Sequence, residues 1–207
     1  MQSRPPQTYR SHLPALENPR NPLGEFRRKT KRMFFGLELP PSFQTQLAEL
    51  NPRLRNVRWV SPEQMHLTLS FLGNVTAEQE LALEEAVDQI KVGPFFVPVR
   101  NLGTFGGKRP TILWAGVGNG HPHLFALHKH VQDAVLRAGS EPDLRAFHPH
   151  ITLARMEGVS SEMLAPLLRQ NADAEFGLLP VKEFVLFSSQ RTPSGSTYRV
   201  EKRFALE

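Results

Sequence analysis

Two near-identical tetrapeptides, His66-Leu67-Thr68-Leu69 and His150-Ile151-Thr152-Leu153, place the strongest constraint on the fold of this 207-residue chain. Each lies in a segment whose residue pattern predicts a β-strand. Successive side chains of a strand point to opposite faces, so each strand presents its histidine and threonine on one face and its aliphatic residues on the other. The fold must therefore bury one face of both strands and leave the other face accessible.

The repetition exceeds what the composition of the chain accounts for. With 8 His, 10 Thr and 27 Leu residues, a random order gives about 0.05 copies of His-x-Thr-Leu. A single His-x-Thr pair on a half-buried strand is usually structural, but these two copies stand 84 residues apart in similar strand contexts. We therefore interpret His66, Thr68, His150 and Thr152 as parts of one functional site.

The residue types in this repeat suit attack on a phosphate. Histidine titrates near neutrality, so one imidazole can accept a proton while the other donates one. The threonine hydroxyls can donate to the non-bridging phosphate oxygens and stabilise the charge that develops in the transition state. Arg155, three residues after Thr152, is a further candidate for a phosphate contact. This chemistry requires no metal ion, and we expect no cofactor.

The composition excludes several other kinds of protein. The chain has no cysteine, which rules out disulfides, thiol catalysis and cysteine-ligated metal sites. No apolar run is long enough for a membrane-spanning helix, so we expect no membrane association. Histidines two residues apart on a helix diverge by about 200°, so we interpret a run of four as solvated side chains and not as zinc ligands. That run consists of His121, His123, His128 and His130.

The positive charge of the chain is concentrated at its N-terminus. Of 25 Lys and Arg and 20 Asp and Glu residues, eight basic and two acidic ones lie in residues 1–32. That leaves 17 basic and 18 acidic side chains in residues 33–207, so any anion site on the body must be local. Residues 1–32 also contain five prolines and little apolar periodicity, which predicts a disordered tail. The tail is either an inert extension or a basic arm that tethers RNA.

Hydrophobic periodicity predicts an irregular alternation of strands and helices in residues 33–207. Helices are expected at residues 42–50, 76–91, 122–138 and 161–170. A capping box of Thr76 and Gln79 would begin the second helix, and Gly139 would end the third. Strands are expected at residues 33–39, 57–60, 66–72, 95–102, 111–117, 144–153, 181–188 and 198–204. Because several strands are adjacent in the sequence, the predicted fold class is α+β with largely antiparallel sheets.

The paired His-x-Thr-Leu strings resemble those of the 2H phosphoesterase superfamily, and the chain is most similar to its RNA 2′,3′-cyclic phosphodiesterases, historically called 2′-5′ RNA ligases. The resemblance covers about residues 32–206, while the basic tail has no counterpart in it. The matching segments are residues 32–40 around Met33-Phe34-Phe35, 66–73 ending in Phe-Leu-Gly, 113–117, 150–155 including Arg155, and 187–198.

This resemblance implies one bilobal catalytic domain over residues 33–207, with pseudo-twofold symmetry. Antiparallel sheets would flank a central groove, with the helices outside, and each lobe would contribute one motif strand to the groove. The implied reaction opens a ribose 2′,3′-cyclic phosphate at an RNA end to leave a 2′-phosphate, without metal or other cofactor. Some members of the family also join tRNA halves through a 2′-5′ bond, which is that reaction in reverse. The resemblance further implies a monomeric, cytoplasmic enzyme whose partner is RNA, including tRNA fragments.

The roles of the site residues follow from the same comparison. We expect His150 to act as general base on water and His66 as general acid toward the departing 3′ oxygen, although a near-symmetric site leaves the reverse assignment open. Thr68, Thr152 and Arg155 would hold the phosphate.

Two rival functions remain open from the sequence. One is a related phosphodiesterase that acts on 2′-5′ oligonucleotides or on small nucleotide cyclic phosphates, and the other is a non-catalytic RNA-binding module. Several further residues have both a structural and a functional interpretation. These are the aromatic residues Phe34, Trp59, Phe71 and Phe105 as stacking surfaces, Lys108 and Arg109 as backbone contacts, His148 as a support for His150, and Tyr198 beside the groove.

Overall fold

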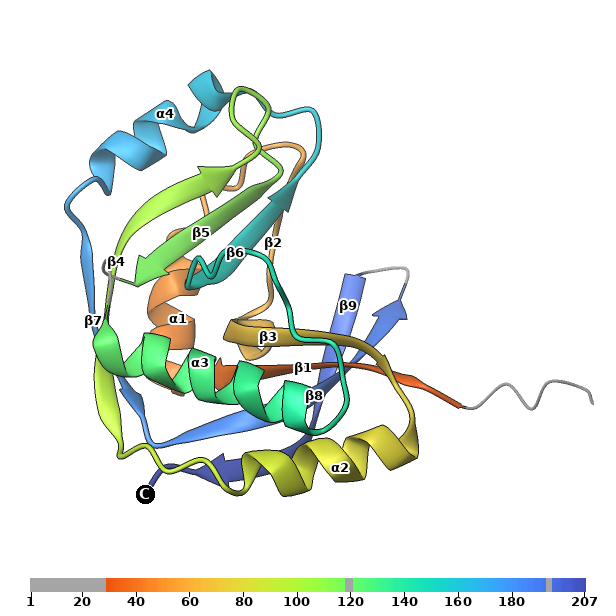
Figure 1. The fold of residues 1–207 in the computed structure, drawn as a ribbon. Helices are drawn as coiled ribbons and strands as arrows, with labels where there is room; N and C mark the ends of the chain where they lie inside the picture. The colour runs from red at the N-terminus through yellow and green to blue at the C-terminus, as the bar shows by residue number, and fades with distance from the viewer. Residues whose placement is uncertain (1–28, 118–120, 193–194) are drawn as a thin grey trace, which may run out of the picture.

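Strands supply most of the ordered structure, and helices cover them from outside (Figure 1). The computed structural model describes residues 29–117, 121–192 and 195–207. Residues 1–28 lie outside this range, and with them most of the predicted disordered tail. The strands are β1 (Lys31–Glu38), β2 (Val57–Trp59), β3 (His66–Val75), β4 (Phe95–Phe105), β5 (Ile112–Val117), β6 (His150–Met156), β7 (Glu175–Val181), β8 (Glu183–Thr192) and β9 (Gly195–Ala205). The helices are α1 (Pro41–Glu49), the 3-10 turn η1 (Pro62–Gln64), α2 (Ala77–Val87), α3 (Pro122–Arg137) and α4 (Ser161–Gln170).

The strands form one curled sheet, in the order β7-β4-β5-β6-β3-β1-β8-β9, with β2 added beside β6. All the recorded pairings are antiparallel. The two halves of the sheet meet where Leu67 of β3 pairs with Ile151 of β6. Each half therefore contributes one motif strand to the junction, as expected for a bilobal α+β fold, although the predicted separate sheets are continuous here.

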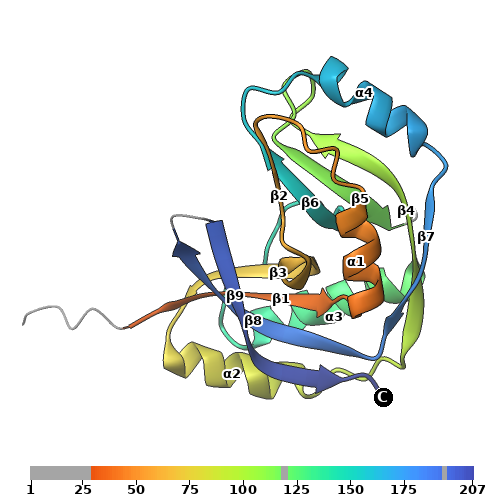
Figure 2. The ribbon, with the colours of Figure 1, turned by 180° about the vertical axis from the view of Figure 1, so that it is seen from behind.

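The helices lie outside the sheet, as predicted. Helices α2 and α3 lie side by side next to β1 and β3, while α4 lies at the far end of the other half, beyond β4 (Figures 1 and 2). Helix α2 begins with the predicted capping box. The Thr76 hydroxyl accepts a hydrogen bond from the Gln79 backbone N–H, and the Gln79 side chain accepts one from the Thr76 backbone N–H. Gly139, with φ of 71°, ends α3 as predicted.

The motif strands are oriented as their alternation predicts. Leu67 and Leu69 of β3, and Ile151 and Leu153 of β6, are at most 2% exposed and belong to the main hydrophobic core. The histidines and threonines between them are only partly buried. Burial of the aliphatic side chains of both strands thus fixes which face carries the polar residues.

Several predicted boundaries differ from the structure; helix α2, for example, ends at Val87 and not at residue 91. The first strand begins at Lys31 and not at Met33, because Lys31 and Arg32 continue the pairing with β3. The strand predicted at residues 144–153 begins only at His150, since Pro149 has no N–H to donate to a ladder. Strand β7 was not predicted; it pairs with β4 at the outer edge of the sheet, and its alternation is broken by Gly177 and Pro180.

Candidate active site

His66 begins β3 and His150 begins β6, on either side of the junction between the two halves of the sheet. The pairing of Leu67 with Ile151 sets the register. Continued by one residue in each direction, this antiparallel register places His66 beside Thr152 and Thr68 beside His150. The four side chains predicted to form one site therefore share one face of two neighbouring strands, in a pseudo-twofold arrangement.

The two imidazoles are held in the same way. Nδ1 of His66 lies 2.8 Å from the carbonyl oxygen of Gln64, and Nδ1 of His150 lies 2.6 Å from the carbonyl oxygen of His148. A carbonyl oxygen only accepts hydrogen bonds, so each Nδ1 carries a proton and donates it. In the neutral form of both rings, Nε2 is therefore the atom available to accept a proton from, or return one to, a bound substrate.

A bulge interrupts each motif strand at its fourth residue. In β3 the partners of Phe35 and Gly36 are Ser70 and Thr68, which leaves Leu69 as the extra residue. In β6 the partners of Leu113 and Trp114 are Ala154 and Thr152, which leaves Leu153 as the extra residue.

The bulges change which residues join the polar face. One extra residue reverses the alternation beyond it, so two consecutive side chains in each strand are buried and the next is exposed. Those exposed side chains are Phe71 and Arg155, which strict alternation would have placed opposite the histidines. The structure thus brings Arg155 to the face of His150 and Thr152, and Phe71 to the equivalent place in the other half.

Aromatic rings surround both histidines. The ring centre of His66 lies 4.8 Å from those of Phe34 and Tyr198 and 5.9 Å from that of Phe187. The ring centre of His150 lies 5.0 Å from that of Phe105, edge to face. Phe34 and Phe105, two of the predicted stacking candidates, thus pack against the catalytic candidates, while Phe71 is 44% exposed beneath the Arg145 guanidinium.

This enclosure controls the protonation of the site. Burial, together with the weaker effect of the charges of His150 and Arg155, lowers the pKa of His66 to about 4, although the hydrogen bond to Gln64 acts in the opposite direction. Burial also lowers the pKa of His150, and the charges of His148 and Arg155 act in the same direction. Both rings are therefore neutral near pH 7 before an anion binds, and Arg155 lies close enough to act on both.

The depressed pKa of His66 predicts a pH-dependent stability. The unfolded chain binds a proton on this ring below about pH 6.5, whereas the folded chain does so only near pH 4, so stability falls as the pH drops through this range. Between pH 7 and pH 5 we expect His66 to contribute a loss of about 2 kcal/mol in the free energy of unfolding. Urea unfolding of the wild type and His66→Asn at both pH values measures it. An equal pH dependence in the two proteins would contradict the assignment.

Trp114 packs near His150, and its indole occupies space that is free only because the neighbouring strand has a glycine there. The indole and imidazole centres are 6.4 Å apart. The indole lies against Gly103 of the neighbouring strand, where a Cβ would come within 2.2 Å of its ring atoms. A rigid ring cannot yield to such a contact as a flexible side chain does.

Gly103→Ala is therefore expected to displace Trp114 and to lower the free energy of unfolding by about 1–3 kcal/mol. Thermal unfolding measured by tryptophan fluorescence reports both effects. Gly93→Ala is the matched control, because a Cβ at Gly93 would meet nothing within 4 Å. Unchanged stability and fluorescence in Gly103→Ala would show that the indole is not held in this place.

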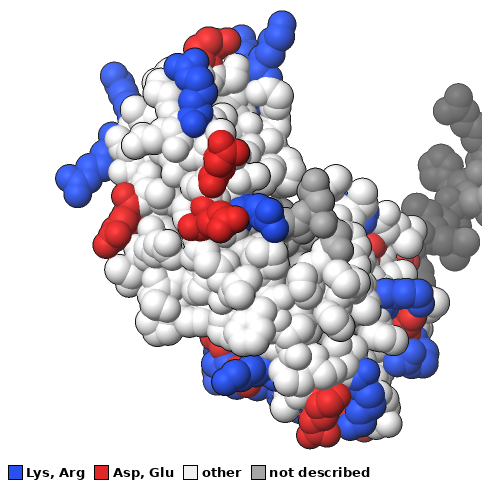
Figure 3. Space-filling view, turned by 90° about the vertical axis from the view of Figure 1, so that its left-hand side faces the viewer, with Lys and Arg blue, Asp and Glu red and all other residues white. Residues whose placement is uncertain are grey.

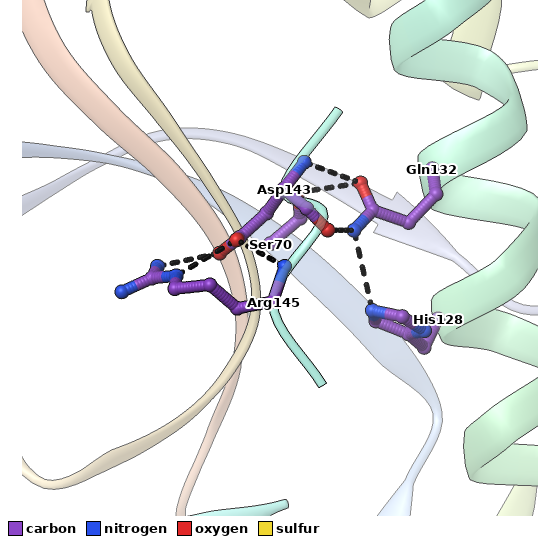
Figure 4. A network of polar contacts seen from close by, with 5 residues as sticks. All are labelled: Ser70, His128, Gln132, Asp143 and Arg145. Atoms are coloured by element: carbon purple, nitrogen blue, oxygen red, sulfur yellow. Dashed lines mark hydrogen bonds and ion pairs between the residues drawn. The ribbon is translucent and has the colours of Figure 1, made fainter. Parts of the chain in front are cut away.

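Gln132 binds the irregular segment between α3 and β6 at Asp143 (Figure 4). Its side chain donates to the carbonyl oxygen of Asp143 at 2.7 Å and accepts from the Asp143 N–H at 3.3 Å and the Ser70 hydroxyl at 3.1 Å. Further along the same segment, the ring of Phe147 stacks on His128 at 3.9 Å. Helix α3 and strand β3 thus hold the segment whose backbone carbonyl, at His148, orients His150.

The remaining candidates lie away from this centre. His121 and His123 stack near Phe95, and Lys108 and Arg109 are exposed in the turn after β4. In residues 29–117, 121–192 and 195–207 no group of three or more His, Asp or Glu side chains is arranged to hold a metal ion. On the face shown in Figure 3, acidic and basic side chains are interspersed without one continuous patch of either sign. No helix in the described part of the chain is long and apolar enough to cross a membrane.

A cavity of about 530 Å³ adjoins His150 and was not predicted from the sequence. Its lining includes Arg100 and Asn101 of β4, and Phe125 and Phe147 from α3 and the segment before β6. These residues are far apart in the sequence and share no pattern, so only the folded chain brings them together. The only local feature of the sequence that could have indicated this cavity is the charged Arg100 among the mostly apolar residues of β4.

Comparison with known proteins places this geometry among phosphoesterases. A family model described as LigT like Phosphoesterase matches residues 37–114 and 117–198. An RNA 2′,3′-cyclic phosphodiesterase of Aquifex aeolicus is 35% identical over 153 residues, which cover 72% of this chain and 81% of the relative. A protein of the same name from Escherichia coli is 29% identical over 181 residues, which cover 85% and 97% of the two chains.

Solved structures give the same result. The crystal structure of Escherichia coli LigT in its apo form superimposes with a TM-score of 0.71 at 29% identity, covering 86% of this chain and 98% of the other. The structure of Escherichia coli LigT with 3′-AMP gives a TM-score of 0.70 at 29% identity, covering 86% and 99%. Both the bilobal fold and the sequence resemblance are thereby confirmed.

Proposed function

The chain belongs to the LigT-like phosphoesterase family, and on this premise we propose that it hydrolyses the 2′,3′-cyclic phosphate at the 3′ end of RNA to a 2′-phosphate. The observation that carries the proposal is the pair of His-Thr faces at the junction of β3 and β6. Each imidazole there donates its Nδ1 proton to a backbone carbonyl and keeps Nε2 for the substrate. A module that only bound RNA would have no need for two imidazoles prepared in this way.

The proposed reaction is an in-line displacement at phosphorus. One histidine accepts a proton from water as the water oxygen bonds to phosphorus, and the other donates a proton to the 3′ oxygen as its bond to phosphorus breaks. The hydroxyls of Thr68 and Thr152 donate to the non-bridging oxygens, and Arg155 neutralises part of the negative charge. Within the described residues neither hydroxyl forms a hydrogen bond to the protein, so both remain available to the phosphate.

Burial favours one order of roles for the two rings. The pKa of about 4 keeps His66 neutral near pH 7, as a general base must be. His150 is more exposed, so it takes up a proton more readily once the phosphate anion is bound, and this suits the general acid. This is the reverse of the order expected from the family resemblance. The pH dependence of kcat/KM in the two single-histidine variants decides between them, because each variant should lose the limb of its own group.

The same site can act on a 2′-5′ phosphodiester. A ribose 5′ hydroxyl in place of water would give 2′-5′ ligation, and by microscopic reversibility the same two histidines would cleave that bond. We also propose the domain organisation, oligomeric state, location and substrates of the enzyme. Residues 33–207 form one catalytic domain, the enzyme is monomeric and cytoplasmic, and its substrates include tRNA fragments with cyclic phosphate ends.

The proposal is tested with a short oligoribonucleotide that ends in a 2′,3′-cyclic phosphate, incubated with the wild type in EDTA. We expect a product with a 2′-phosphate, identified by its resistance to a 3′-specific nucleotidase. A 3′-phosphate product would contradict the assigned leaving group. Bound but unchanged RNA would favour a binding module, and turnover of only 2′-5′ oligonucleotides would favour the alternative enzyme.

A further inference from the structure

The cavity beside His150 has only this residue in common with the five residues assigned to the reacting phosphate. Its volume, about 530 Å³, lies in the range of small-molecule sites. Phe105 and Trp114, which support His150, line one part of it, and Phe125 and Phe147 line another, while His66 is not part of its lining. Whatever occupies the cavity therefore contacts one catalytic histidine from the side of β4 and β5.

Cross-strand pairing directs a cation into this cavity, because Arg100 of β4 pairs with Gly116 of β5, and Gly116 pairs with His150 of β6. Arg100 pairs with Gly116 and Leu102 pairs with Ala115, so Asn101 is the extra residue. Asn101 adopts the left-handed conformation, with φ of 58°, and its N–H donates to the carbonyl oxygen of Ala174 at 2.8 Å. The bulge thus lies directly after Arg100, at a residue type that tolerates the left-handed conformation better than most.

Arg100 has no carboxylate partner in the described part of the chain. Its cross-strand neighbour in β7 is Glu175, but the two form no ion pair. An exposed guanidinium without a partner, at the lining of a cavity, suits an anionic group of a ligand. The side chain is exposed and its place in the sheet is set by the pairing of Arg100 with Gly116, so binding would not require a rearrangement of the backbone.

Aromatic rings form another part of the wall. Phe147 is stacked on His128 at 3.9 Å, and its centre lies 5.3 Å from that of Phe125, edge to face. Phe125 is 38% exposed. The rings are thus held in place by α3 and still present surface to the cavity. Flat aromatic surfaces beside a guanidinium are typical of single-stranded RNA sites, where bases stack and phosphates are bound.

We propose that this cavity binds the nucleotide on the 5′ side of the terminal one, with Arg100 on the phosphodiester that joins the two. The inference rests on the proposed function, in which the histidines, threonines and Arg155 already bind the cyclic phosphate. A second cation beside aromatic rings then matches a second phosphate and a second base. The site selects an RNA end over a free nucleoside 2′,3′-cyclic phosphate.

The test compares two substrates, adenosine 2′,3′-cyclic phosphate and the dinucleotide ApA with a 2′,3′-cyclic phosphate end. We expect the wild type to prefer the dinucleotide in kcat/KM by about tenfold or more. Arg100→Ala should remove that preference, mainly through KM, and leave turnover of the mononucleotide unchanged. Arg169→Ala is the matched control, because Arg169 is exposed on α4 and does not line the cavity.

A third substrate isolates the contact itself. This substrate is the same dinucleotide with a neutral methylphosphonate as its internal linkage. Its kcat/KM with the wild type should be lower than that of the normal dinucleotide by about the factor that Arg100→Ala causes on the normal linkage. Arg100→Ala should not distinguish the two linkages.

Three results would overturn the inference. Equal losses on the mononucleotide and the dinucleotide would mean that the cavity holds the terminal nucleoside or acts through His150. No effect of Arg100→Ala on either substrate would mean that the cavity is not a subsite. If the wild type turns over neither substrate, the proposed function itself fails, and this inference fails with it.

Discussion

Replacement of His66 or of His150 by asparagine is expected to lower kcat for hydrolysis of the cyclic phosphate by about 10³-fold. Asparagine can still donate a hydrogen bond to the carbonyl of Gln64 or of His148, as Nδ1 does now. It has no counterpart of Nε2, so proton transfer is lost while the local backbone contact is kept. Single-turnover rates on an oligoribonucleotide with a cyclic phosphate end measure the effect.

The control separates loss of chemistry from loss of fold. His130→Asn changes an exposed histidine on α3 and should retain the wild-type rate. Both active-site variants should bind the RNA with unchanged affinity and unfold cooperatively. A rate within a few-fold of the wild type in either one would remove that histidine from the mechanism.

Replacement of Thr68 or of Thr152 by valine is expected to lower kcat by about 10²-fold, the usual effect of removing one donor to a developing oxyanion. Valine has the shape of threonine and suits a strand, so the packing of β3 and β6 should be preserved. The pseudo-twofold geometry predicts similar losses at the two positions. Steady-state kinetics on the same oligoribonucleotide measures them.

Serine provides the rescue for this prediction. Thr68→Ser and Thr152→Ser keep the hydroxyl and should recover most of the rate. Thr45→Val, on the exposed side of α1, should have no effect. If serine is as inactive as valine, the methyl group and not the hydroxyl matters, and the role as a donor to the phosphate is wrong.

The faces of the two motif strands could be predicted because they depend only on the period of a strand. Leu67 and Ile151 are fully buried and pair with each other, and the polar residues beside them share the opposite face. The same local rule failed beyond the bulges at Leu69 and Leu153, because a bulge depends on how the neighbouring strand pairs. The placement of Arg155 on the catalytic face is therefore a property of the sheet and not of its own sequence.

The surroundings of His150 could not be predicted for a related reason. The segment from residue 139 to residue 149 is held from α3 by hydrogen bonds of Gln132 to the backbone of Asp143 and by the stacking of His128 on Phe147, and neither contact leaves a sequence pattern. Arg100 reaches the cavity because it pairs with Gly116, which in turn pairs with His150. Each of these features requires two or three separate segments to be in place at once.

The central claim is that His66 and His150 act together on one phosphate, and a double-variant cycle tests it most directly. Single-turnover rates of the wild type, His66→Asn, His150→Asn and the double variant are measured on one oligoribonucleotide with a 2′,3′-cyclic phosphate end. If both rings serve the same displacement, the double variant should be about as slow as the slower single variant, because groups that act as a unit are not additive. The claim would be contradicted if the rate loss of the double variant equalled the product of the two single losses, or if either single variant kept the wild-type rate.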